Sequence, residues 1–289
     1  MTKPLDAVTV VIPVHNVADR LDRIVGWRLA MEKSGRNFEI IVVDDGSTDG
    51  TAEKLAKKEP RARILRHDTR KGFGACLRTA LPEAKHPLFF YTALDYPYTP
   101  SDIRPYFDRI ELKDEFLGKS ADLISGCRTG LPTPLLPRLT ALTWRIFWRV
   151  FAGMPIPDPS PWHGWSQFWY RTRVSWVYGV PLADVNSCFK LFRTAFLRRF
   201  PIQSDGDMVH TELVAKATFL TSIMDEQPLT PKPDPVPAIG DTSADRRRLS
   251  PNRALFALPA QVATPGADAP GSPKTETPAT PTPTPVPLT

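Results

Sequence analysis

The chain has 289 residues, of which 42% are apolar and 10% aromatic, and its formal net charge at pH 7 is +6. This size and composition predict one well-buried domain of roughly 220 to 250 residues with a tail, and argue against two domains. The positive charge suits anionic partners such as phosphates, nucleic acid or acidic lipid surfaces. No apolar run reaches the 18 residues of a membrane-spanning helix, so we expect none.

The cysteines and the N-terminal residues indicate in which cellular compartment the protein is expected. Cys76, Cys127 and Cys188 are scattered without metal-ligand spacing, which favours a reduced, cytoplasmic setting. The opening MTKPLDAVTVVIP lacks the apolar core and cleavage pattern of a signal peptide. Membrane contact is therefore expected to be peripheral.

The first two expected strands end in polar residues. Residues 8–14 predict a buried strand that ends at His15 and Asn16, followed by an amphipathic helix over residues 19–31. The next strand, within FEIIVVDDGSTDGT, ends in Asp44 and Asp45. In open α/β sheets ligands bind at the carboxyl ends of such strands. The plainer alternative is an acidic turn in which Ser47 or Thr48 caps a helix over residues 52–58.

The following segments continue the alternation of strand and helix. A strand over residues 62–65 leads to RKGFG, in which Arg70, Lys71 and Gly72 precede a helix over residues 75–84. Free backbone N–H groups at that helix start predict an anion site, and the alternative is a flexible surface turn. Strands over residues 87–94 and 121–125, with a helix from Ser101 between them, complete a pattern typical of a mostly parallel sheet with right-handed crossovers.

Six blocks in this order resemble the family 2 glycosyltransferases. They are VVIPVHN, EIIVVDDGSTDGT, RKGFGACLRTAL, FFYTALDYPYTPSDI, ISGCR and DVNSCFKLFRTAFL, and the resemblance extends over about residues 8–217. Within the family the chain is most similar to the dolichol- or polyprenyl-phosphate sugar transferases of the dolichol-phosphate mannose synthase type. The resemblance implies a GT-A fold: a Rossmann-like, mostly parallel central sheet flanked by helices, in a single α/β domain.

The resemblance also implies a nucleotide-sugar site. A GDP- or UDP-sugar would be the donor, and Mg²⁺ or Mn²⁺ would stabilise the departing diphosphate. Asp95 matches the last acid of the family's DxD motif, so it is expected to hold the metal and to act in catalysis. The residues implied to bind the nucleotide are Pro13, His15, Asn16, Asp44, Asp45, Arg70, Lys71 and Gly72.

Two departures from the motif leave an alternative open. Ala93 stands where the first acid of the motif is usual, and Pro97 replaces the usual Gln. One carboxylate then remains where the family has two, which predicts weaker metal binding. An inactive nucleotide-sugar-binding protein is the alternative from a different functional class.

The acceptor side rests on the later blocks. A lipid phosphate is already an anionic nucleophile and needs no strong base, so positioning and charge screening would carry the reaction. By resemblance Asp184 lies at the active-site floor as a catalytic residue. The residues expected on the acceptor side are Arg128, Arg138, Arg145 and, partly as support, Lys190. A saccharide or protein hydroxyl would need a base, for which Asp184, Asp207 and Glu212 are the candidates.

The middle and the tail differ in composition. Six of the seven tryptophans lie between Trp144 and Trp176. Arginines recur at helical spacing over residues 138–151. Together with the tryptophans, these arginines predict a helix that lies in a membrane interface, and the alternative is a helix of the core. Residues 154–181 suggest an acceptor lid or a partner surface. Strand and helix are expected over residues 189–199 and a helix over residues 206–219.

The domain bounds follow from these segments. We expect a transferase domain over residues 1–225 that contains the aromatic and basic segment 135–181. A closing strand and the basic run at residues 246–248 fall in 226–258, and a disordered Pro/Thr/Ala-rich tail follows in 259–289. Nucleic acid is not an expected partner, because no recognition motif accompanies the charge.

Overall fold

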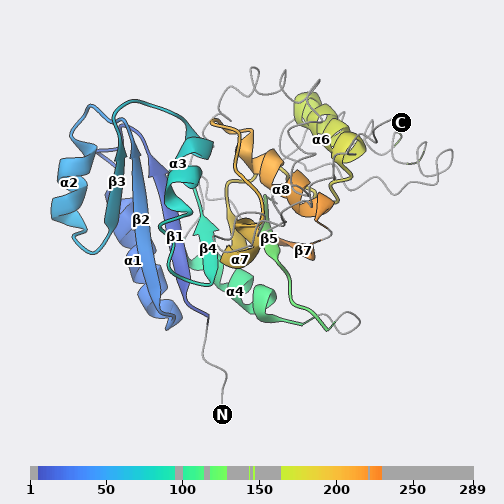
Figure 1. The fold of residues 1–289 in the computed structure, drawn as a ribbon, viewed down its shortest axis with the longest axis horizontal. Coiled ribbons are helices and arrows are strands. Elements are labelled where there is room, and N and C mark those ends of the chain that lie inside the picture. Colours follow the sequence, from blue (N-terminus) through green and yellow to red (C-terminus); the bar gives the residue numbers. More distant parts are fainter. Residues whose placement is uncertain are drawn as a thin grey trace, which may run out of the picture.

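The centre of the protein is a seven-stranded sheet in the order β3-β2-β1-β4-β6-β5-β7 (Figure 1). The computed structural model describes residues 6–94, 100–113, 118–128, 143, 146, 164–220 and 222–229. The strands are β1 Val8–Val14, β2 Phe38–Asp45, β3 Arg63–His67, β4 Leu88–Tyr91, β5 Leu123–Arg128, β6 Lys190–Arg193 and β7 Met224–Leu229.

Strand direction makes the sheet mostly parallel. β1 pairs in parallel with β2 and β4, β2 pairs with β3, and β5 pairs with β7. β6 runs antiparallel to both of its neighbours, β4 and β5. The start of β6 therefore lies beside the carboxyl ends of β4 and β5. This reversal brings the chain before β6 to the same edge as the ends of the parallel strands.

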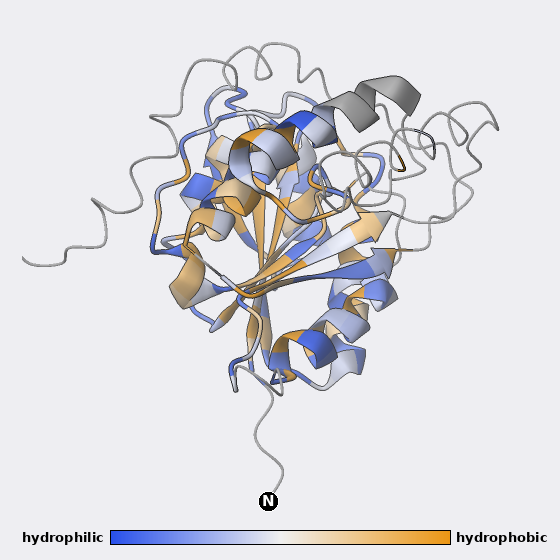
Figure 2. Cartoon of the chain, turned by 90° about the vertical axis from the view of Figure 1, so that its right-hand side faces the viewer, coloured by the Kyte–Doolittle hydropathy of each residue, from blue (hydrophilic) through white to orange (hydrophobic). Residues whose placement is uncertain are grey.

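Two layers of helices cover the sheet. One layer holds α1 Asp22–Ser34, α2 Thr51–Lys58 and α4 Arg104–Glu111, with the short 3-10 turn Pro100–Ile103 before α4. The other holds α3 Phe73–Ala80, α6 Gly164–Tyr178, α7 Thr194–Leu197 and α8 Val209–Phe219. Alternate residues of the strands feed two separate apolar cores, so that Val10 and Val42 face the first layer while Val11 and Val43 face the second. Figure 2 shows the apolar strands between helices with more polar outer surfaces.

The expected α/β, GT-A-type fold is confirmed. Each strand and helix expected between residues 8 and 128 is present with its ends shifted by a few residues. The strand and helix expected over residues 189–199 are present as β6 and α7, but the antiparallel direction of β6 and the helix α6 were not anticipated. The cap expected for α2 is wrong, because its N-cap residue is Gly50 and neither Ser47 nor Thr48 caps the helix. Within the described residues, no helix is both long and apolar enough to span a membrane.

Several expectations concern residues outside the described part. These are Asp95 and Pro97, the expected helix residues Arg138 and Arg145, the basic run at 246–248 and the tail from 259. Most of the aromatic segment before α6 also lies there. The expected metal, membrane and domain assignments at these positions stay predictions.

Candidate active site

The ends of β1 and β2 are tied together by their side chains. The Asn16 N–H donates to Ser47 Oγ at 2.9 Å, and the Thr48 N–H donates to Asn16 Oδ1 at 2.9 Å. His15 Nδ1–H donates to the Asp45 carbonyl at 2.8 Å. Asn16 has a left-handed φ of 51°, which asparagine tolerates better than most residues. His15 and Asn16 thus stand at the site edge as expected, and Ser47 joins the two turns.

Asp45 lies at the centre of a buried network. Its Oδ1 accepts from His67 Nδ1–H at 2.7 Å and from the Lys71 N–H at 2.8 Å, and its Oδ2 accepts from the Gly72 N–H at 2.8 Å. Burial alone would raise the pKa of Asp45. The bonds from His67, Lys71 and Gly72 outweigh it and hold that pKa below its usual value. The carboxylate is therefore a structural anion that fixes the loop after β3.

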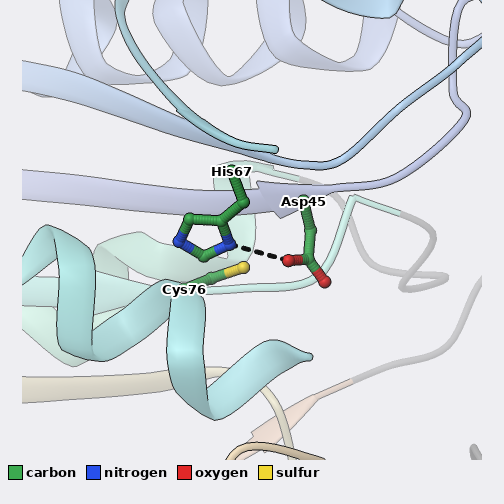
Figure 3. Close-up of side chains that lie close together, drawn as sticks. All are labelled: Asp45, His67 and Cys76. Carbon is green, nitrogen blue, oxygen red and sulfur yellow. Dashed lines mark hydrogen bonds and ion pairs between the residues drawn. The ribbon is translucent and has the colours of Figure 1, made fainter. Parts of the chain in front are cut away.

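Cys76 completes a cluster with Asp45 and His67, in which the three candidate ligand atoms lie within 4.8 Å of one another (Figure 3). In this structure the groups contact one another: His67 Nδ1 and Asp45 are at hydrogen-bond distance, and His67 Nε2 lies 2.9 Å from Thr79 Oγ1. Burial, and then Asp45, raise the pKa of the Cys76 thiol far above its usual value, which favours the neutral thiol in this network. The cluster supports Asp45.

Asp44 is buried with one oxygen unsatisfied. Its Oδ1 accepts from the Ser47 N–H at 3.0 Å. Its Oδ2 has no hydrogen-bond partner and lies 3.5 Å from Nε of Arg66. A buried acceptor without a partner is uncommon, and it often marks a place where a ligand or water completes the structure.

Gly46, directly after β2, and Gly72, after β3, allow close packing. A Cβ on Gly46 would lie 2.6 Å from Arg70 N, and one on Gly72 would collide with the Asp205 carbonyl. That carbonyl accepts from the N–H groups of Gly74 and Ala75, at 2.7 and 3.2 Å. The expected anion site on free N–H groups at this helix start is therefore wrong, and so is the flexible turn. The groups that remain open to an anion are the exposed side chains of Arg70 and Lys71.

The loop that carries Asp184 reaches the same edge from the other half of the sheet. Lys190, the first residue of β6, pairs with Tyr91 at the end of β4 and with Ser125 of β5. Residues 183–187 precede it and so lie past the carboxyl end of β4, whereas β5 continues for three residues beyond Ser125. Asp184 is buried there, and its expected place at the floor of an active site stays a prediction.

The expectation that Lys190 contacts the acceptor is corrected. Its side chain is fully buried, and its ammonium donates to the Val185 carbonyl at 3.1 Å and to the Ser187 carbonyl. A cation held under the loop supports the loop and does not line a surface. Pro13 is likewise buried inside β1, opposite Val43, and shapes the strand end.

The base candidates other than Asp184 differ in their surroundings. Glu212 is buried, pairs with Lys216, and accepts from the N–H groups of Gln203 and Ser204 at 2.8 and 2.7 Å. Its lone pairs are engaged, so the expectation that it can act as a base is wrong. Asp207 is half-buried in the turn before α8.

Two site residues were missed from sequence. His67 ends β3 as Asp45 ends β2, so the rule of polar strand ends could have found it. Glu226 of β7 accepts from the Ala183 and Asp184 N–H groups, at 2.7 and 2.9 Å. Its partners lie more than 40 residues earlier, and no local pattern shows that contact. Arg128 ends β5, and its side chain lies outside the described part.

A model of glycosyl transferase family 2 matches residues 9–179, more than half of the chain. The chain belongs to that family. Its blocks on β1, β2 and β4 correspond to the strand ends that meet at this edge. The dolichol-phosphate mannosyltransferase of Pyrococcus furiosus is 31% identical over 107 residues, 36% of this chain and 30% of that protein. The undecaprenyl-phosphate 4-deoxy-4-formamido-L-arabinose transferase of Edwardsiella ictaluri is 39% identical over 66 residues, 22% and 20% of the two chains.

Solved structures of similar fold extend over more of this family 2 chain. Glucosyl-3-phosphoglycerate synthase of Mycobacterium tuberculosis has a TM-score of 0.53 at 16% identity, covering 91% of this chain and 83% of that one. Mannosyl-3-phosphoglycerate synthase of Rubrobacter xylanophilus has a TM-score of 0.52 at 17% identity, with 93% and 79% covered. The curated relatives are matched over less than a third of their length, whereas the fold is shared across most of the chain.

Proposed function

We propose that the protein transfers a sugar from a GDP- or UDP-sugar to a polyprenyl or dolichyl phosphate at a membrane surface. The observation that carries this proposal is the meeting, at one edge of the sheet, of the ends of β1, β2 and β4 with the loop of Asp184. The names of the two polyprenol-linked relatives support the choice of acceptor.

The donor half of the proposal rests on the β1–β3 side. The exposed Asn16 offers polar atoms to a base and ribose, and the buried Asp44 carboxylate lies beside it, next to Arg66. Arg70 and Lys71 project from a loop that Asp45 holds in place, and their charges suit the diphosphate. Asp45 acts here through the loop, because its own oxygens are engaged.

The transfer step follows from the acceptor's charge. A phosphate oxygen of the acceptor attacks the anomeric carbon of the sugar. The bond from that carbon to the diphosphate breaks, and the nucleoside diphosphate leaves with the electron pair. Arg70 and Lys71 offset the growing negative charge, while Asp184 orients the reacting groups as the proposed catalytic residue. A divalent ion at Asp95 would add charge stabilisation. A solved neighbour of similar fold contains Mn²⁺ and UDP.

The membrane part of the proposal has support on two helices. Trp176 and Val177 of α6 and Phe219 of α8 are exposed, and the Phe219 ring contacts Tyr178. Exposed aromatic side chains of this kind favour a lipid headgroup region. Vesicles that contain anionic lipid should retain the protein, and Trp176→Ala should reduce that retention.

A hydroxyl acceptor is the second candidate. Such an acceptor needs a base, and Asp184, buried beside the ends of the strands, and the half-buried Asp207 are the carboxylates that could serve. The third candidate is an inactive nucleotide-sugar-binding protein, which the alanine at position 93 favours.

The test is a panel of GDP- and UDP-sugars with Mn²⁺, with and without polyprenyl phosphate. Wild type is compared with Asp95→Ala and with Asp108→Ala, which removes an exposed acid of α4. Lipid-dependent nucleotide release that only Asp95→Ala abolishes supports the proposal. Release that requires a saccharide instead supports the second candidate, and nucleotide binding without turnover supports the third.

A further inference from the structure

The loop over residues 183–187 is held at every residue by a side chain from elsewhere in the fold. The contacts are the Ala183 and Asp184 N–H groups to Glu226, the Val185 and Ser187 carbonyls from Lys190, and Asn186 Oδ1 from Thr211 at 3.0 Å. A loop held through the backbone at four residues and through the side chain of Asn186 has little freedom to rearrange. The loop is therefore formed before any substrate arrives.

Two of these holding residues stand in one row of the sheet. Lys190 of β6 and Glu226 of β7 both lie directly opposite Ser125 of β5. Residues paired in this way face the same side of the sheet. β6 and β7 flank β5 on its two sides. The Lys190 ammonium on β6 donates hydrogen bonds to loop carbonyls, and the Glu226 carboxylate on β7 accepts hydrogen bonds from loop N–H groups. The charges match the two kinds of backbone group that they hold.

The Glu226 carboxylate uses both oxygens for this purpose. One oxygen accepts from Ala183 at 2.7 Å and the other from Asp184 at 2.9 Å. Such charge-assisted bonds are about twice as strong as neutral ones. The Asp184 N–H is part of the residue whose side chain is the proposed catalytic group. A shift of the Glu226 carboxylate therefore moves Asp184 directly.

We propose that Glu226 is a positioning residue for sugar transfer, which holds Asp184 in its working place through the backbone of residues 183 and 184. This inference rests on the proposed role of Asp184 and adds a residue on a strand that no block of the family resemblance includes. Glu226 itself touches no reacting atom in this scheme. Its effect on the reaction passes through Asp184.

The decisive variant is Glu226→Gln. An amide has one acceptor oxygen, and its NH₂ group would face a backbone N–H, so one of the two bonds is lost. A misplacement of about 1 Å near the reacting atoms costs on the order of 100-fold in rate. We expect kcat to fall about 10- to 100-fold while the KM for the donor stays unchanged. Glu83→Gln, which removes a half-buried carboxylate paired with Arg63 at the start of β3, is the matched control and should leave both constants unchanged.

A double-mutant cycle with Asp184→Asn separates positioning from a general structural role. If Glu226 acts through Asp184, the double variant is no slower than Asp184→Asn alone. Independent losses that multiply would overturn the proposal. Glu226→Asp keeps the charge but draws the oxygens back by about one bond length. It should show a partial loss if Glu226→Gln fails to fold, and full activity of Glu226→Asp would also overturn the proposal.

Amide hydrogen exchange gives a readout that needs no activity. Exchange at Ala183 and Asp184 should quicken at least 10-fold in Glu226→Gln and stay at the wild-type rate in Glu83→Gln. Unchanged exchange at both amides means that Glu226 does not hold the loop. If exchange quickens but Asp184→Asn keeps full turnover, the proposed role of Asp184 fails and the holding role of Glu226 stands.

Discussion

Asp45→Asn tests the conclusion that this carboxylate is a structural anion under the basic loop. The wild-type group accepts three hydrogen bonds, from His67, Lys71 and Gly72, and is almost fully buried. Asparagine has a single acceptor oxygen, and its NH₂ group would face at least one of these donors. An unsatisfied buried donor costs about 1–3 kcal/mol, and bonds to a charged acceptor are worth about 1.5–3 kcal/mol each. We therefore expect a loss of about 2–4 kcal/mol in the free energy of unfolding at pH 7.

The pH dependence of that loss has a definite sign. The hydrogen bonds hold the pKa of Asp45 below its ordinary value in the folded protein. Its stabilising contribution is therefore complete above the unfolded pKa, about 4, and is lost as pH falls through the lower folded pKa. Urea unfolding of wild type and Asp45→Asn should show the full difference at pH 7 and a smaller one below about pH 4. Asp108→Asn, which changes an exposed acid, is the control. Equal stability of wild type and Asp45→Asn at pH 7, or a difference that persists undiminished at pH 3, would refute the reasoning.

Three further predictions address the same edge of the sheet. Gly72→Ala should destabilise the protein by more than Gly118→Ala, because both glycines have positive φ but only Gly72 has a backbone carbonyl where the Cβ would go. The conformational cost common to both variants is about 1–3 kcal/mol, and urea unfolding measures the additional loss of stability in Gly72→Ala. Lys190→Met should cost roughly 1–3 kcal/mol for each of the two carbonyls it leaves without this donor, whereas Lys57→Met on the exposed face of α2 should be neutral in the same assay. Partial burial, and then the charge of Asp184, raise the pKa of Glu226, whereas the pKa of Asp45 is lowered. On acidification the amides of residues 183 and 184, which Glu226 holds, should therefore lose protection from hydrogen exchange at a higher pH than the amides of residues 71 and 72, which Asp45 holds. Loss of protection in the reverse order would contradict these assignments.

The strands could be predicted from sequence because each is a local pattern. The run VTVVIPV is buried along its whole length and became β1 without a shift of either end. Asp44 and Asp45 end β2 at the predicted edge. Parallel pairing also follows from the alternation of strand and helix, as the registers of β1 with β2 and β4 confirm. The sequence blocks therefore predicted the strands of the donor side of the edge and their parallel pairing.

The contacts that shape the site were not predictable, because they join distant parts of the chain. Gly72 and Gly74 read as an anion-binding pattern, and the same residues also allow the close approach of Ser204 and Asp205. Choosing between these two uses requires knowing that the turn before α8 folds onto α3. The expected acceptor contact of Lys190 failed for the same reason, since its burial depends on the pairing of β6 between β4 and β5.

Three carboxylates at this edge share one geometry, which explains why acidic residues here are poor guides to direct ligand contact. Asp45 accepts from the N–H groups of residues 71 and 72, Glu212 from those of 203 and 204, and Glu226 from those of 183 and 184. Each thus binds two consecutive N–H groups of a loop that connects to the next element. Irregular backbone at an active site leaves such donors without secondary-structure partners, and a carboxylate with two oxygens satisfies a pair of them at once. The negative charges of Asp45, Glu212 and Glu226 therefore hold loops in place, and two of these loops carry residues for which we propose substrate contacts: Arg70, Lys71 and Asp184.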